Sequence, residues 1–415
     1  MDQTLKNRQY IKFCTYGFLK NLRFFDAFFI LFLVDKGISY TQIGILYAIR
    51  EISTNLLELP SGLLADSFGR KSSLVISFVA YICSFLIFYL FSDFWMFLVA
   101  FLLFGVGEAF RSGTHQGMIM DYLELKGWKD QSVYYYGHTR SWSQKGSAIS
   151  ALLAGALVFS GGSYQIIFLF STIPYILNMF NILTYPSRLN RPLNRSKEKK
   201  HMALGSALRT LIRALKQPLV FRTIYSSAAH TAYLRTVKDY IQLVMINLAL
   251  IIPLLLQLET NKKNGIVVGV LYFFIYLATS LASKHSHKLA KKNRGKLPYL
   301  TLLAGFGAGL ISGLLFQYEI WILSLLAFAG IYIVENIRKP ILTGAVADLV
   351  PNEILTSVIS AQALLRTIIT ALLALVFGLI ADLRGLGVSL IIVSVLLALS
   401  TVLINFIWNP RTNKT

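Results

Sequence analysis

Two apolar segments of the chain contain a glutamate that is followed three residues later by an arginine. Glu108 and Arg111 lie in the first of these segments, and Glu335 and Arg338 lie in the second. Residues three apart lie on one face of a helix, where opposite charges can pair. A carboxylate can also exchange its cationic partner for a proton, and an arginine can bind an anion. His115 shares the face of Arg111, and the sequence favours a hydrogen-bonded interior histidine over a proton relay there.

Further charges lie within apolar segments. They are Arg23, Asp26, Arg50, Glu51, Glu58, Arg140, Lys145, Arg235, Lys238, Asp239 and Arg366. A charge at the centre of a bilayer costs about 2.5–3.5 kcal/mol, so it usually faces a partner or a cavity. For each charge a structural ion pair, contact with a ligand and proton binding are open alternatives. Cations outnumber carboxylates in this set, which favours an anionic or zwitterionic ligand.

The elements that position these charges must cross a membrane. The chain has 415 residues, of which 55% are hydrophobic and only 14% charged, whereas soluble domains carry about a quarter charged residues. About 20 apolar residues are needed for one transmembrane helix. We therefore predict an all-α, polytopic membrane protein with twelve transmembrane helices. The seventh is too long for one simple span, so we expect it to tilt, to extend beyond the bilayer or to break near Pro253. The predicted spans are 12–34, 41–61, 73–92, 94–121, 133–158, 164–185, 221–256, 265–283, 297–316, 319–348, 355–381 and 386–408.

Positive charges are concentrated in every second loop between these spans. Most Lys and Arg residues outside the spans lie in the N-terminus, every second loop and the C-terminus, and the alternate loops hold only Lys36, Lys262, Lys263 and Arg384. Positively charged loops stay in the cytoplasm, so both termini are predicted to be cytoplasmic in a cell inner (cytoplasmic) membrane. The net charge of +21 is explained in this way, and no nucleic-acid partner is expected.

A polar stretch divides the chain into two similar halves. We predict an N-terminal six-helix bundle at 1–185, a cytoplasmic linker at 186–220 and a C-terminal six-helix bundle at 221–415. Residues 203–216 form an amphipathic pattern that fits either a helix on the anionic inner leaflet or a solvated linker helix. The halves repeat, because Asp121 follows Glu108 at the same spacing at which Asp348 follows Glu335.

The segment between the second and third spans carries a recognisable motif. It reads Gly62-Leu63-Leu64-Ala65-Asp66-Ser67-Phe68-Gly69-Arg70-Lys71. This stretch resembles the signature loop between helices 2 and 3 of the major facilitator superfamily, with Ser67 in place of the usual base after the aspartate. The resemblance implies two pseudo-symmetric six-helix bundles of the major facilitator fold. It also implies that Arg70 pairs with an acid at the end of helix 4, a role that Asp121 fits, to close a cytoplasmic gate.

The resemblance implies a secondary active transporter that moves a small solute by alternating access. No nucleotide-binding loop is present, so the energy is expected to come from an ion gradient, with protons as the first candidate ion, or from the gradient of the solute itself. Glu108, Glu335 and Asp26 are the candidate proton couplers. The alternatives are a drug or metabolite efflux proton antiporter and a non-transporting receptor or lipid-handling protein on the same fold. No nucleophile–base set or metal-ligand spacing is found, so neither an enzyme nor a cofactor is expected.

The expected partners are a small-molecule solute, protons and the lipid bilayer, and the protein is expected to be a monomer. The candidate residues for solute binding or proton coupling are Arg23, Asp26, Glu51, Glu108, Arg111, His115, Arg140, Arg235, Asp239, Glu335, Arg338 and Arg366. The candidate residues of the cytoplasmic gate are Gly62, Asp66, Gly69, Arg70, Lys71, Asp121 and Asp348.

Overall fold

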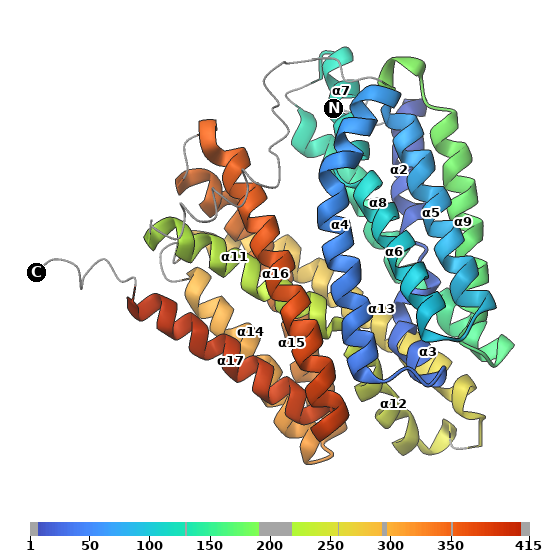
Figure 1. Ribbon diagram of the computed structural model, residues 1–415, viewed down its shortest axis with the longest axis vertical. Coiled ribbons are helices and arrows are strands. Elements are labelled where there is room, and N and C mark those ends of the chain that lie inside the picture. Colours follow the sequence, from blue (N-terminus) through green and yellow to red (C-terminus); the bar gives the residue numbers. More distant parts are fainter. Residues whose placement is uncertain are drawn as a thin grey trace, which may run out of the picture. The chain divides into compact units, whose positions relative to one another are not determined.

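The computed structural model describes residues 7–128, 131–190, 218–255, 257–292, 297–349 and 352–407. In this part of the chain the regular elements are α-helices and short 3-10 helices, and no strand occurs (Figure 1). The all-α prediction is therefore confirmed. The amphipathic helix predicted at 203–216 lies outside the described residues.

Eight elements of the described chain are long and apolar enough to cross a membrane by themselves. They correspond to the third, fourth, sixth and eighth to twelfth predicted spans. The fourth is divided in two by Ser112 and Gly113, where the backbone of Gly113 has a φ of +68°. The helices are α5 (Arg70–Leu90), α6 (Phe94–Arg111) with α7 (Thr114–Leu125), α9 (Ile166–Leu183), α13 (Thr260–Lys292), α14 (Leu297–Gln317), α15 (Trp321–Leu349), α16 (Asn352–Arg384) and α17 (Leu386–Ile407).

The other four predicted spans are helical but interrupted or more polar. The first span is α2 (Arg8–Lys20), η1 (Phe24–Ala27) and α3 (Phe29–Asp35), and the seventh is α11 (Pro218–Val237), η4 (Lys238–Tyr240) and α12 (Ile241–Ile251). The second and fifth are α4 (Tyr40–Phe68) and α8 (Ser132–Gly161).

The interruption of the seventh span differs from the prediction. Helix α12 ends next to Pro253, as expected, but the helix also breaks at Lys238 and Asp239. Charged residues therefore mark the break in this span, as Arg23 and Asp26 do in the first.

The chain divides into two compact units. Unit 1 comprises Met1–Phe32, Ser53–His201 and Gln257–Tyr276, and unit 2 comprises Leu33–Ile52, Met202–Leu256 and Leu277–Thr415. The first part of α4 thus belongs to unit 2, and the first part of α13 belongs to unit 1. The assignment of two six-helix domains to 1–185 and 221–415 stays a prediction.

Glycines allow close helix contacts within each unit. In unit 1, a Cβ on Gly155 of α8 would lie 2.6 Å from the carbonyl oxygen of Gly265 of α13. In unit 2, a Cβ on Gly44 of α4 would collide with the backbone of Ala374 of α16. Small residues let transmembrane helices approach until their backbones touch, which replaces the hydrophobic driving force that lipid cannot supply.

The same pair of helices in unit 2 is joined at its end by a polar cap. Helix α4 begins at Tyr40, and the carboxylate of Asp382 on α16 accepts hydrogen bonds from the backbone N–H groups of Tyr40 at 2.9 Å and Thr41 at 2.7 Å. The first N–H groups of a helix have no partner inside the helix, and a negative charge is favourable beside them. Asp382 therefore binds, from α16, two N–H groups at the start of α4, in addition to the cap that Ser39 provides by accepting a hydrogen bond from the backbone N–H of Gln42 at 3.2 Å.

The contact between α8 and α13 yields a first prediction. Replacing Gly155 with alanine must push the two backbones apart, and overpacking of this kind typically costs about 1–3 kcal/mol. Gly137, on the same helix, has nothing within 4 Å of its Cβ position. Gly137→Ala should therefore stabilise the protein by up to about 1 kcal/mol, because alanine favours the helix. Thermal unfolding of the purified variants measures both effects. Equal unfolding temperatures for the two variants would contradict the role of Gly155.

Candidate functional site

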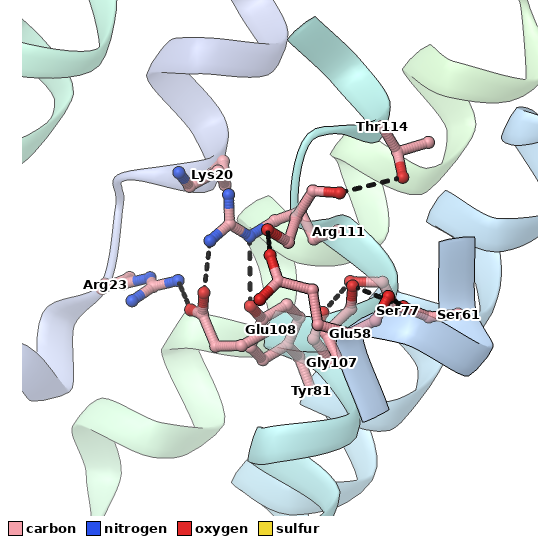
Figure 2. A network of polar contacts seen from close by, with 12 residues as sticks. Lys20, Arg23, Glu58, Ser61, Ser77, Tyr81, Gly107, Glu108, Arg111 and Thr114 are labelled. Carbon is pink, nitrogen blue, oxygen red and sulfur yellow. Dashed lines mark hydrogen bonds and ion pairs between the residues drawn. The ribbon is translucent and has the colours of Figure 1, made fainter. Parts of the chain in front are cut away.

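The carboxylate of Glu108 lies between two arginines in unit 1 (Figure 2). Its Oε1 atom is 2.7 Å from Nη2 of Arg23, and its Oε2 atom binds Nη2 of Arg111. Arg23 reaches this position because α2 ends at Lys20 and the chain enters η1 only at Phe24. The predicted pair of Glu108 and Arg111 is confirmed, and Arg23 is a second partner that spacing within one helix did not indicate.

Two tyrosines hold the arginines of this network. Nε of Arg23 donates a hydrogen bond to the hydroxyl oxygen of Tyr175 on α9 at 2.8 Å, and Nε of Arg111 donates to that of Tyr81 on α5 at 3.2 Å. Each guanidinium is thus bonded to a carboxylate on one side and a phenol on the other. The network fixes four helices of unit 1 around one carboxylate, and sequence analysis missed both tyrosines.

The polar contacts of the second part of α4 extend this network. The hydroxyl of Ser112 donates to the carboxylate of Glu58, and the hydroxyl of Ser61 donates to the carbonyl oxygen of Ala109 at 2.9 Å (Figure 2). These bonds attach α4 to the end of α6, directly beside Arg111. The carboxylate of Glu58 is therefore bonded to the turn between α6 and α7.

A cavity of about 150 Å³ lies next to Arg111 in unit 1, and we call it the basic cavity. Its charged lining residues are Lys20 of α2, Arg111 of α6 and Arg140 of α8. Polar and aromatic side chains complete the wall. They include Tyr16, His115, Gln116, Tyr136, Thr139 and Ser143. Three cations on one small surface give the cavity a positive potential that attracts anions.

His115 forms one wall of the basic cavity. Its ring is stacked on that of Tyr16, with 3.5 Å between the ring centres and 9° between the planes. Its Nε2 atom is hydrogen-bonded to the hydroxyl of Tyr185 at 3.1 Å. His115 is therefore hydrogen-bonded, as the sequence favoured, and a role in proton transfer stays a hypothesis.

The equivalent glutamate of unit 2 has different partners. Glu335 of α15 accepts hydrogen bonds from the hydroxyl of Thr231 at 2.6 Å and lies 2.8 Å from Nδ1 of His230 on α11. The guanidinium of Arg338 instead donates to the hydroxyl of Thr301 at 2.6 Å and to the backbone oxygen of Ser226 at 2.7 Å. In the described residues, Glu335 and Arg338 therefore form no ion pair, although their spacing made one possible.

A second charged group in unit 2 joins the first part of α4 to α11 and η4. Oε2 of Glu51 is 2.7 Å from Nη1 of Arg235, and Oδ2 of Asp239 accepts a hydrogen bond from Tyr47 at 2.8 Å. Nζ of Lys238 is 2.7 Å from the other oxygen of Asp239. The break at η4 places Lys238 and Asp239 where they meet α4.

Two further candidates lie beside these groups. Arg366 of α16 interacts electrostatically with Glu51 in unit 2, and Asp26 interacts electrostatically with Arg23 and Lys20 in unit 1. Each therefore belongs to the charge network of its own unit. Within the described residues no group of three or more His, Cys, Asp or Glu side chains could hold a metal ion.

The signature stretch is mostly helical rather than a loop. Gly62 and Asp66 lie in the last turns of α4, which ends at Phe68, and Arg70 begins α5. Gly69 between them has a φ of +96°, and a Cβ there would lie 2.6 Å from the side chain of Asn190. Only glycine fits this position, because its backbone conformation and its space both exclude a side chain.

The charged residues of this stretch are bonded to their surroundings. Nη1 of Arg70 is 2.6 Å from Oδ2 of Asp121 on α7, so the predicted pair is confirmed. Lys71 donates its backbone N–H to the side-chain oxygen of Asn190 at 2.9 Å and its ammonium to the carbonyl oxygen of Tyr185. The side chains of the other two acidic gate candidates, Asp66 and Asp348, lie outside the described part of the chain.

Comparison with known proteins identifies the family. The profile of the Major Facilitator Superfamily matches residues 17–374. The chain belongs to the major facilitator superfamily, a family of membrane transporters. It is 22% identical over 94% of its length to the uncharacterized MFS-type transporter YxaM of Bacillus subtilis (strain 168), of which it covers 93%.

Solved structures agree with this fold. The nucleoside transporter NupG is similar with a TM-score of 0.71 at 13% identity, over 98% of this chain and 97% of that one. A bacterial homolog of the human lysosomal transporter Spinster gives a TM-score of 0.68 at 14% identity, over 97% of both chains. The predicted fold of a multi-pass major facilitator protein is thus confirmed.

The different partners of the two glutamates of this major facilitator protein can be tested by double-mutant cycles. Residues in contact show coupling energies of about 0.5–3 kcal/mol. Glu108→Gln and Arg111→Gln should therefore be strongly coupled in unfolding, and Glu335→Gln and Arg338→Gln, which interact only through space, should be coupled more weakly. Chemical unfolding of the single and double variants measures both cycles. Equal coupling in the two cycles would show that Glu335 and Arg338 pair after all.

The gate role of Arg70 and Asp121 makes another prediction. If this ion pair stabilises one conformation only, Arg70→Ala and Asp121→Ala should each shift the conformational balance and slow transport about tenfold, which corresponds to about 1.4 kcal/mol. The exchanged variant with Arg70→Asp and Asp121→Arg should recover most of the rate. Lys262→Ala, which removes an exposed ion pair with Glu259, is the matched control. Wild-type flux in both single variants would refute the gate.

Proposed function

We propose that this protein is a proton-coupled secondary transporter that moves a small anionic or zwitterionic solute across the cytoplasmic membrane by alternating access. The observation that supports this proposal best is the basic cavity, whose wall carries Lys20, Arg111 and Arg140 and, among the described residues, no carboxylate. Unbalanced cations are costly inside a membrane unless an anion or water compensates them. A solute with negative charge compensates them directly.

The ion pairs of Glu108 with both Arg23 and Arg111 support the proposed coupling to protons. Arg111 contacts Glu108 and also lines the cavity, so an anionic solute at Arg111 competes with the Glu108 carboxylate. A buried carboxylate that loses a cationic partner favours its protonated form. Solute binding and proton binding therefore support each other at this site, and both ligands are released together when the ion pair reforms.

The Glu335–His230 pair is a second place where a proton can be held. His230 is fully buried and its other ring nitrogen has no hydrogen-bond partner among the described residues. Asp26 is the third candidate coupler, through its interaction with Arg23. The proposal includes cytoplasmic termini, because the basic loops would then face the cytoplasm.

Flux measurements in proteoliposomes test the proposal. Organic anions and amino acids that raise the unfolding temperature of the purified protein are loaded with and without an imposed pH gradient. We expect the gradient to drive accumulation, which a proton-conducting ionophore abolishes. Accumulation that ignores the pH gradient and the ionophore would refute proton coupling, and the absence of flux for every stabilising solute would refute transport.

A variant of Glu108 tests the coupling residue. Glu108→Gln keeps the shape of the side chain but cannot exchange a proton, so solute exchange across the membrane should persist while proton-driven accumulation falls at least tenfold. Glu259→Gln is the control, because Glu259 is 72% exposed and pairs only with Lys262 among the described residues. Proton-driven accumulation that is unchanged in Glu108→Gln would exclude this carboxylate and leave Glu335 and Asp26.

A further inference from the structure

The charges around the basic cavity do not balance. Lys20, Arg111 and Arg140 line the cavity, and Arg23 lies behind Arg111 on the far side of Glu108. Against these four cations stand two carboxylates: Glu108, which Arg23 and Arg111 share, and Asp26, which interacts with Arg23 and Lys20. The cations at the cavity therefore outnumber the carboxylates that contact them.

The nearest further carboxylates are bonded elsewhere. Glu58, beside Arg111, accepts a hydrogen bond from the hydroxyl of Ser112, and on α7 Asp121 is paired with Arg70 at 2.6 Å. On α8, Lys145 does not line the cavity, and its ammonium lies 4.5 Å above the ring of Trp142. Among the described residues, no carboxylate lies in the cavity wall itself.

The two cations without a carboxylate bond at the cavity are Lys20 and Arg140. No ion pair joins either side chain to an acidic residue in the described part of the chain. They come from different helices, α2 and α8. A ligand that bonds both must therefore carry negative charge at two points or on a compact group.

The polarity of the cavity limits the ligand further. Hydroxyl and amide groups of Gln116, Thr139 and Ser143 in the wall can bond additional oxygens. An oxyanion fits this polarity, whereas an apolar solute does not.

We infer that the basic cavity binds a small dianionic group, a phosphate or a dicarboxylate, with Lys20 and Arg140 as the residues that select a dianion over a monoanion. This inference rests on the proposed function and narrows its solute class. A charge of −2 balances the two cations that have no carboxylate bond, Lys20 and Arg140, whereas a monoanion balances only one of them. Arg140 offers a planar fork that suits either oxyanion, and Lys20 offers a point charge.

Binding to the purified, full-length protein tests this inference without transport. Calorimetric titrations in a phosphate-free buffer compare inorganic phosphate, succinate and acetate at a pH where phosphate and succinate are dianions. We expect phosphate or succinate to bind at least tenfold more tightly than acetate. The dianion that binds more tightly identifies the class of oxyanion. Equal affinity of all three anions, or no binding of either dianion, would overturn the inference.

Matched variants assign the selectivity to residues. Lys20→Gln and Arg140→Gln should each lower the ratio of dianion to acetate affinity about tenfold, because one positive charge is lost. Lys20→Arg should keep the ratio, and Lys145→Gln, on the same helix as Arg140, should leave it unchanged. A ratio that stays the same in both glutamine variants would overturn the assignment, whatever the variants do to stability.

The two proposals fail in different ways. If proteoliposomes transport other solutes with a pH gradient while the purified protein binds no dianion, the proposed function stands and this inference is wrong. If the dianion binds with the expected dependence on Lys20 and Arg140 but is never transported, the inference stands and the proposed function is wrong.

Discussion

The shared ion pair of Glu108 is the interaction on which unit 1 depends. One carboxylate holds Arg23 from the end of α2 and Arg111 from the end of α6, and tyrosines of α5 and α9 hold the two guanidiniums. Removing one partner of such a buried pair leaves an uncompensated charge, which typically costs about 3–5 kcal/mol. The network therefore ties the chain at the ends of α2 and α6 to α5 and α9, next to the basic cavity.

Helix breaks are the means by which the chain brings its charges together. Arg23 precedes η1, Arg111 ends α6 just before Gly113, and Lys238 with Asp239 forms η4. Inside a bilayer, irregular backbone is tolerated only where protein or a water-filled cavity covers it. The breaks and the charges therefore require each other, because the same polar surroundings satisfy the free backbone groups and the ions.

The sequence predicted the spans, the polar face of α6 and the pair of Arg70 with Asp121, because each depends on composition, on spacing within one helix or on a family motif. The sequence could not predict which residues of different helices are bonded to each other. Tyr81, Tyr175 and Tyr47 bond charged residues, but tyrosine is common in membrane helices and carries no periodic signal. His230 pairs with Glu335 because α11 and α15 meet at that depth, and spacing along one helix cannot specify which residue of another helix arrives there.

The repeated Glu-x-x-Arg pattern has acquired different roles in the two units. In unit 1 the arginine shares its carboxylate with Arg23 and also lines a cavity, so an anion can compete for it. In unit 2, Arg338 is 1% exposed and bonds the start of α14 and the backbone of α11, where no solute can reach it without unpacking the helices. The glutamate of unit 2 is instead bonded to a histidine, the side chain best suited to a proton near neutral pH. The two glutamates therefore have different surroundings: that of unit 1 lies beside a cavity lined by cations, and that of unit 2 is bonded to a fully buried histidine.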